Sequence, residues 1–229
     1  MIMRQLKILF LSALVFSVIG CSRDNSPPVR LNDCYRDTKR MKRYIKAQGI
    51  DKVTLVWSTE GPWSIDLSDS SVINLGWSIG IPIDKIIINN TEVSSLHPLK
   101  KQPSLRWLEA NNTQVSDLSP LAGIRHLETL EIANTKVSDL APLRNIEIID
   151  LDIQGIPCAD LSDIPLEKLR SIHFSLDPLK EWKGVKRVKA KKNLIVNRFM
   201  NNEDFWAEYN RVYSGDNHEN GTILERKGE

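Results

Sequence analysis

The sequence contains few of the residues and motifs from which active sites are built. Its 229 residues include 3 cysteines and 4 histidines. None of the histidines lies at a zinc-site spacing from a cysteine or from another histidine. The sequence also has no glycine-rich phosphate loop and no Gly-x-Ser-x-Gly motif. We therefore expect a protein that is not an enzyme, with no catalytic residue, metal or cofactor.

The sequence also lacks a strong charge of one sign. The formal net charge is +2 at pH 7, and it falls to about zero if Arg4 and Lys7 are removed with a leader segment. We expect no nucleic-acid partner. The charge is nevertheless segregated, because the central part is acidic and a basic cluster lies near the C-terminus. That cluster contains Lys186, Arg187, Lys189, Lys191 and Lys192.

A hydrophobic run near the N-terminus has the features of a secretory signal. Arg4 and Lys7 precede apolar residues 8–19, and Gly20-Cys21 follows them. The run is shorter than the roughly 20 residues that a membrane-spanning helix needs. An ordinary signal peptide with an incidental cysteine is one interpretation. The favoured one is that the run and Cys21 resemble the lipobox signal of bacterial lipoproteins.

This resemblance implies a lipid anchor. In that family the cysteine thiol receives a diacylglyceryl group, the signal is cleaved before the cysteine, and the new amine is acylated. Cys21 would carry the lipid here, with residues 1–20 as the signal and residues 21–32 as a polar tether. Ser22, rather than Asp, follows the cysteine, which by the family's sorting rule favours the outer membrane. We expect a protein anchored in the outer membrane that faces the periplasm, with exposure on the cell surface as the alternative.

The central region repeats one phrase three times. Residues 90–99, 112–121 and 134–143 each begin with Asn-Thr and end with Pro-Leu, and each copy starts 22 residues after the last. The first apolar strand positions of these copies are Ile86, Leu108 and Leu130. The positions three before and two, seven, ten and thirteen after each of these residues are also apolar in all three copies. A period of 20–29 residues with such columns is typical of a leucine-rich-repeat solenoid.

Weaker copies extend the pattern on both sides, starting at Ile65, Leu151 and Ile172. We therefore predict a repeat solenoid of about six turns of 21–22 residues. Parallel strands should line its concave face, short irregular or 3-10 segments its convex side, and helices should cap its ends. Cys158 falls in a valine column, so we expect it to be a buried core residue.

Residues 115–121 and 137–143 resemble the 22-residue repeats of bacterial internalins. The resemblance covers about half of the chain, and it implies the solenoid fold. This chain has Thr91, Thr113 and Thr135 in a column where the family usually has asparagine. We expect these hydroxyls to bond to backbone groups of their own and the neighbouring coil, although threonine could simply tolerate the turn. Internalins are surface adhesins, but the repeat is far more widespread than that role.

The flanking sequences predict caps. Residues 33–63 should form a helix and a strand, residues 64–185 the repeats, and residues 186–213 a C-terminal cap. Residues 214–229 have almost no apolar content and should form a flexible tail. The aromatic side chains of Phe205, Trp206 and Tyr209 should cover the end of the core. A binding patch is the alternative role for them.

The predicted concave face carries the candidate binding residues. The strand register stacks Glu109, Glu131 and Asp152, with Trp107 and Asp150 alongside. Like charges opposite one another destabilise a sheet, so the row is either fully solvated or neutralised by a basic partner. Trp107 favours binding, because tryptophan is enriched at interaction hot spots. We expect a monomer that binds a protein with a basic surface.

These features together predict a non-catalytic protein-binding module of the cell envelope. One specific version is an immunity-type lipoprotein that neutralises a toxin arriving in the periplasm. The alternative is a structural envelope component or a surface adhesin that binds host or polysaccharide. The basic caps, with the lysines of residues 186–192 clustered, would then contact anionic lipid or polysaccharide.

The lipid anchor is directly testable. Cys21→Ser should leave an unprocessed or soluble protein, because the acylated thiol is lost. Cys158→Ser and Cys34→Ser are the controls and should still fractionate with membranes. Membrane fractionation and fatty-acid labelling measure the outcome. Normal membrane recovery and labelling of the Cys21 variant would refute the lipoprotein interpretation.

Overall fold

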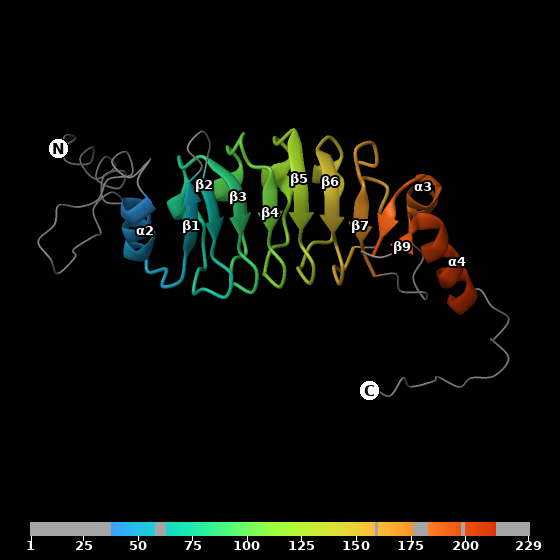
Figure 1. The fold of residues 1–229 in the computed structure, drawn as a ribbon, viewed down its shortest axis with the longest axis horizontal. Helices are drawn as coiled ribbons and strands as arrows, with labels where there is room; N and C mark the ends of the chain where they lie inside the picture. Colours follow the sequence, from blue (N-terminus) through green and yellow to red (C-terminus); the bar gives the residue numbers. More distant parts are fainter. Residues whose placement is uncertain (1–37, 58–62, 159, 176–182, 198–199, 214–229) are drawn as a thin grey trace, which may run out of the picture.

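The computed structural model describes residues 38–57, 63–158, 160–175, 183–197 and 200–213. The predicted signal, Cys21, the tether, Cys34 and the C-terminal tail lie outside these ranges. Within them the chain forms an elongated solenoid with a helix at each end (Figure 1). No helix in the described ranges is long and apolar enough to cross a membrane.

One sheet runs the length of the solenoid. In the described residues it has 9 strands in chain order, and the strands from β2 to β8 are parallel neighbours. The end pairs β1–β2 and β8–β9 are antiparallel. The strands are β1 Thr54–Trp57, β2 Trp63–Asp66, β3 Ile83–Ile87, β4 Trp107–Glu109, β5 His126–Glu131, β6 Glu147–Asp152, β7 Ser171–His173, β8 Ile195–Val196 and β9 Met200–Asn201.

The register confirms the predicted repeat. Ile86 pairs with Leu108, Leu108 with Leu130, Leu130 with Leu151, and Leu151 with Ile172. Each of these side chains is at most 1% exposed. Cys158 is also buried, as its place in the valine column predicts. The stacked coils therefore share one continuous apolar core, whose burial is the main source of stability.

Short 3-10 helices form the convex side, as predicted. They are η2 Gly76–Ser78, η3 His97–Leu99, η4 Ser119–Leu121 and η5 Ala141–Leu143. The prolines of the three clear repeats lie in the first turn of η3, η4 and η5. A proline fits there because its missing N–H would have no helical partner and its φ is already helical.

Asparagine, not threonine, links neighbouring coils at the turn after each strand. Thr91, Thr113 and Thr135 donate to the carbonyl three residues earlier in their own coil, at 2.7–2.8 Å. The predicted hydroxyl bonds to the neighbouring coil are therefore wrong. The side-chain amides of the preceding residues make those links. Asn112 donates to Asn90 at 2.7 Å, and Asn134 donates to Asn112 at 2.9 Å.

Backbone geometry explains why asparagine occupies this column. Asn90, Asn112 and Asn134 have φ values of 55–57°, a left-handed conformation that asparagine tolerates better than most residues. Gly155 holds the equivalent position in the next coil with φ 68°. The amide ladder ends there, because glycine has no side chain to continue it.

Helices cover both ends of the core. At the N-terminal end, α2 Thr38–Ala47 buries Met41 and Ile45 completely. At the C-terminal end lie α3 Val185–Ala190 and α4 Asn202–Tyr213. Phe205 and Trp206 on α4 contact Phe174 of the last coil, with ring centroids 5.8 and 6.4 Å away. Tyr209 packs on both rings, so these aromatic side chains close the core rather than form a separate exposed patch.

Candidate binding surface on the concave face

The structure brings together all five predicted binding residues. Trp107 pairs with Thr129, and Thr129 with Asp150. Glu109 pairs with Glu131, and Glu131 with Asp152. These two adjacent columns lie on the outward side of strands β4, β5 and β6, opposite the buried Leu108, Leu130 and Leu151. We call Glu109, Glu131 and Asp152 the acidic row.

Side-chain amides from the preceding coils hold the two glutamates of the acidic row. Asn89 Nδ2 donates to Glu109 Oε2 at 2.9 Å, and Asn111 Nδ2 donates to Glu131 Oε2 at 2.8 Å. Each amide oxygen accepts a backbone N–H of the next coil, from Asn111 at 2.8 Å and from Ala133 at 2.7 Å. This geometry fixes the amide orientation so that its NH₂ group faces a carboxylate. Adjacent strands are only about 4.8 Å apart, so these bonds offset repulsion along the row.

Trp107 and Glu109 form one unit with Lys85. Trp107 Nε1 donates to Glu109 Oε1 at 2.6 Å. Lys85 Nζ lies 3.8 Å from the centroid of the Trp107 ring and 3.5 Å from Glu109 Oε1. The lysine thus makes a cation–π contact and an ion pair together. Both oxygens of Glu109 are occupied, and its side chain is only 16% exposed.

The acidic row differs from the prediction at Asp152. We expected an outward carboxylate open to solvent, but its side chain is 7% exposed. His173 Nδ1 lies 3.3 Å from Asp152 Oδ2. The backbone N–H of Gln154 donates to Asp152 Oδ1 at 3.0 Å. Asp152 therefore stabilises its own turn and offers a partner little accessible surface.

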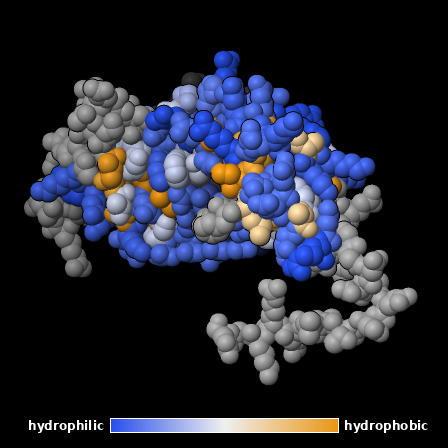
Figure 2. Space-filling model, turned by 45° about the vertical axis from the view of Figure 1, so that its right-hand side comes forward, coloured by the Kyte–Doolittle hydropathy of each residue, from blue (hydrophilic) through white to orange (hydrophobic). Residues whose placement is uncertain are grey.

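Asp150 and Glu131 are the accessible carboxylates of the predicted set. Asp150 is exposed and accepts a hydrogen bond from Ser171 Oγ at 2.6 Å. Glu131 is half-buried, with its bond from Asn111 on one oxygen only. Figure 2 shows a largely hydrophilic surface over the visible face, with small separate hydrophobic patches. This surface suits a polar, charged contact better than a purely apolar one.

A groove of about 670 Å³ lies at the starts of the strands, whereas the acidic row lies at their ends. Its rim has both charge signs, with Arg106 paired to Glu128 at 3.3 Å and His126 to Glu147 at 2.7 Å. Arg106 also bonds to Asp84, which together with Glu128 raises the pKa of the guanidinium. Lys168, Arg170 and Lys192 add positive charge at the C-terminal side of the groove.

The described residues do not assemble a reactive group. Burial raises the pKa of the Cys158 thiol, so the unreactive protonated form persists at neutral pH. Within the described ranges, no three His, Cys, Asp or Glu residues are placed to hold a metal ion. The arrangement on the concave face is suited to non-covalent contacts.

Sequence reasoning missed Asn89 and Asn111. A signal was present, because Asn-Asn pairs at 89–90 and 111–112 recur at the repeat period. The second asparagine of each pair forms the turn ladder, and the first holds a glutamate. The next coil has Ala133 in place of the first asparagine, and Asp152 is bonded there by His173 and by the backbone N–H of Gln154.

The two glutamates should respond differently to removal of charge. Glu109→Gln should cost about 1–3 kcal/mol in the free energy of unfolding, because one glutamine oxygen cannot accept both the Trp107 and Asn89 donors. Glu131→Gln keeps an acceptor for Asn111, and should stay within about 0.5 kcal/mol of wild type. Urea unfolding of both variants makes the measurement. Equal costs would show that the two carboxylates are not held as described.

The comparison with protein families agrees with the fold. Residues 103–145 match the model of a family described as leucine rich repeats, in two copies. A solved internalin C2 of Listeria monocytogenes is 25% identical with a TM-score of 0.47, over 48% of this chain and 50% of that one. A second Listeria monocytogenes internalin, inlF, is 20% identical with a TM-score of 0.45, over 52% of this chain and 35% of that one.

The matched region thus spans half of the first internalin and about a third of the second. No curated protein matches the chain. The strand register, the buried apolar columns and the family match together make this protein a leucine-rich-repeat solenoid.

Proposed function

We propose that the protein is a non-catalytic, lipid-anchored envelope module whose concave face binds a protein with a basic surface. Leucine-rich-repeat solenoids typically present such a face to protein partners. The observation that carries the proposal is the acidic row, whose glutamates are fixed by hydrogen bonds, with Trp107 and Asp150 beside it. The two columns of this face from β2 to β7 contain five carboxylates, on Asp66, Glu109, Glu131, Asp150 and Asp152, against Lys85 and His173.

The proposal is supported by the rigidity of these groups. A side chain that is ordered only on binding costs about 0.5–1.5 kcal/mol in lost freedom. Glu131 and Asp150 are already held by hydrogen bonds from Asn111 and Ser171. A basic partner would meet oriented carboxylates, and less of the interaction energy would be lost to ordering them.

Charge also favours a basic partner over an acidic one. Complementary potentials accelerate encounter, and like charges at a contact cost several kcal/mol. Trp107 adds an aromatic surface next to the carboxylates, and its ring is held by Lys85 on one face. The mixed-charge groove at the strand starts would give the same partner a second, orienting contact.

We further propose an immunity-type role for this module. The Cys21 signal would place it at the outer membrane, facing the periplasm, where incoming toxins pass. A small rigid solenoid with one charged face suits blocking a single basic toxin surface. The specific test is expression in cells challenged with a secreted toxin encoded beside its gene. Protection that disappears with loss of the concave carboxylates supports the role, and no protection against that toxin contradicts it.

Binding should depend on the two accessible carboxylates. Glu131→Lys with Asp150→Lys should weaken capture of the envelope partner at least about tenfold, since each reversal opposes a basic surface. Lys136→Glu with Lys186→Glu are matched reversals at exposed sites away from the face and should leave capture unchanged. Affinity capture from envelope extract, repeated at rising salt, provides the measurement. A partner retained by the carboxylate variant but lost from the control would place the site elsewhere.

A further inference from the structure

The exposed side of α2 carries positive charge alone. The helix, Thr38–Ala47, contains no acidic residue, and its Lys39, Lys42, Arg43 and Lys46 are exposed. Its apolar residues Met41 and Ile45 are fully buried against the first coil. Packing against the end of the solenoid therefore accounts for the apolar side of the helix. The four cations on the other side have no role in that packing.

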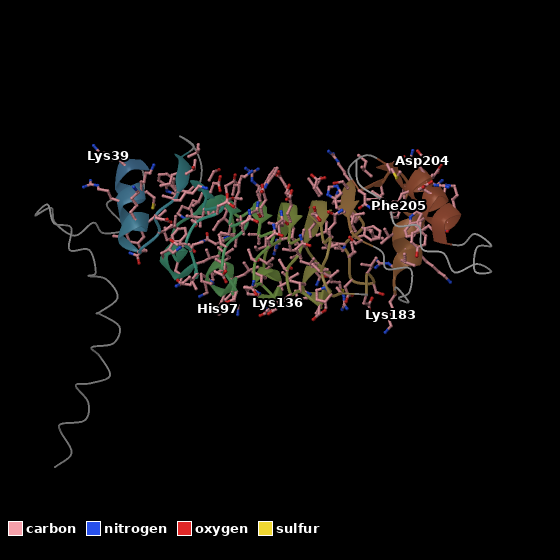
Figure 3. The ribbon with its side chains drawn as sticks, turned by 90° about the horizontal axis from the view of Figure 1, so that it is seen from below. Lys39, His97, Lys136, Lys183, Asp204 and Phe205 are labelled. Carbon is pink, nitrogen blue, oxygen red and sulfur yellow. The ribbon has the colours of Figure 1, made fainter. Side chains whose placement is uncertain are left out.

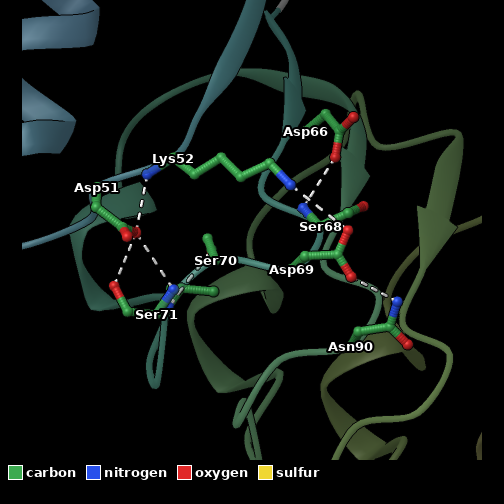
Figure 4. Close-up of polar contacts among 9 residues, drawn as sticks. Asp51, Lys52, Asp66, Ser68, Asp69, Ser70, Ser71 and Asn90 are labelled. Carbon is green, nitrogen blue, oxygen red and sulfur yellow. Dashed lines mark hydrogen bonds and ion pairs between the residues drawn. The ribbon is translucent and has the colours of Figure 1, made fainter.

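The carboxylates of the loop after α2 and of the first coil bond to groups outside the helix. Asp51 Oδ1 accepts from Ser71 Oγ and from its neighbour's backbone N–H at Lys52, both at 2.9 Å. Asp69 bonds to Asn90 at 2.8 Å and pairs with Lys52 at 3.5 Å (Figure 4). Hydrogen bonds from Ser71 and from Asn90 lower the pKa of Asp51 and of Asp69 respectively. Both acids stay ionised, but they fasten the loop after α2 to the first coil.

Three of the α2 cations are consequently not neutralised by these acids. In the described part of the chain, Lys42, Arg43 and Lys46 take part in no ion pair or hydrogen bond through their side chains. A helix face that carries only positive charge attracts an anionic surface. Water alone can solvate such a charged face. Its position in the molecule therefore has to show whether an anionic surface is within reach.

The position of α2 points to the membrane. The helix lies at one end of the solenoid, with α3 and α4 at the other (Figure 1). Lys39 extends from this end, far from Asp204 and Phe205 (Figure 3). Thr38 lies 17 positions after Cys21, so the connecting chain reaches at most about 60 Å. A lipid on Cys21 would thus keep α2 within about 60 Å of the bilayer, and the limit for the opposite cap is longer by the length of the solenoid.

We infer that the exposed face of α2 is a docking surface for anionic phospholipid, on which the solenoid stands by its N-terminal end. This inference rests on the proposed lipid anchor. Each Lys or Arg near an anionic leaflet strengthens association by about fivefold. The concave face lies along the side of the solenoid, so it would remain open to a partner while the molecule stands on α2.

Lysine labelling in vesicles tests this contact. The mature full-length protein, as cells process it, is reconstituted in phosphatidylcholine vesicles with or without about 30 mol % phosphatidylglycerol. A water-soluble amine reagent then modifies exposed lysines. Lys39, Lys42 and Lys46 should react about threefold less with phosphatidylglycerol present, and this protection should vanish at about 0.5 M salt. Lys136 and Lys186 should react equally in both vesicles.

A pair of arginine variants provides the matched comparison. Arg43→Glu reverses one α2 charge without removing a labelled lysine, and should return the α2 lysines to the reactivity seen in phosphatidylcholine. Arg125→Glu makes the same change at an exposed site elsewhere and should preserve the protection. Equal α2 reactivity in the two vesicles would overturn the inference. Protection that is independent of lipid charge, or centred on Lys186, would overturn it as well.

The anchor and the docking surface give separate signals. Flotation with pure phosphatidylcholine vesicles reports the lipid anchor, because α2 has no anionic surface to meet there. A protein that fails to float with them, yet shows α2 protection on phosphatidylglycerol vesicles, would refute the anchor and support the docking surface. A protein that floats with both, without α2 protection, would support the anchor and refute the docking surface.

Discussion

Parallel register is the constraint on which the rest of this molecule depends. A repeat of constant length stacks each residue on its counterpart, with backbones about 4.8 Å apart. Apolar columns gain from this, since Leu108, Leu130 and Leu151 stack in register and are at most 1% exposed. Charged columns do not, because Glu109 is brought beside Glu131. The same register that builds the core therefore creates an electrostatic problem on the concave face.

The chain meets this problem with amides at the same period. Asn89 and Asn111 each bond to two groups of the next coil, accepting a backbone N–H and donating to a glutamate. The bonds connect neighbouring coils at the surface, while the core connects them inside. They also leave the carboxylates oriented toward the concave side. Stability and a preorganised acidic surface thus arise from one set of contacts.

The fold could be predicted from sequence because apolar periodicity is a local and repeated signal. The register at Ile86, Leu108 and Leu130 followed from spacing alone, and so did the burial of Cys158. The coil-to-coil bonds could not be assigned in this way. Thr113 and Asn112 are adjacent polar residues, and only the left-handed backbone at Asn112 decides which of them faces the next coil.

The candidate surface was predicted in position but not in exposure. Alternation along the strands placed Trp107 and the four carboxylates on one face, as the register confirms. Alternation says nothing of neighbours across coils, so it missed that Glu109 is covered by Lys85 and Trp107. It also missed that Asp152 is covered by its contact with His173. Accessibility depends on these contacts, which leave Glu131 and Asp150 as the groups that a partner can reach.

A double-mutant cycle on Asn111 and Glu131 tests the central claim most directly. The free energies of unfolding are measured for Asn111→Ala, Glu131→Ala and the double variant. If the amide holds the carboxylate across coils, the two changes should be coupled by at least about 0.5–1 kcal/mol, as for contacting groups that share a hydrogen bond. Additive costs, within about 0.3 kcal/mol, would show that the acidic row is not held by the repeat and would contradict the account.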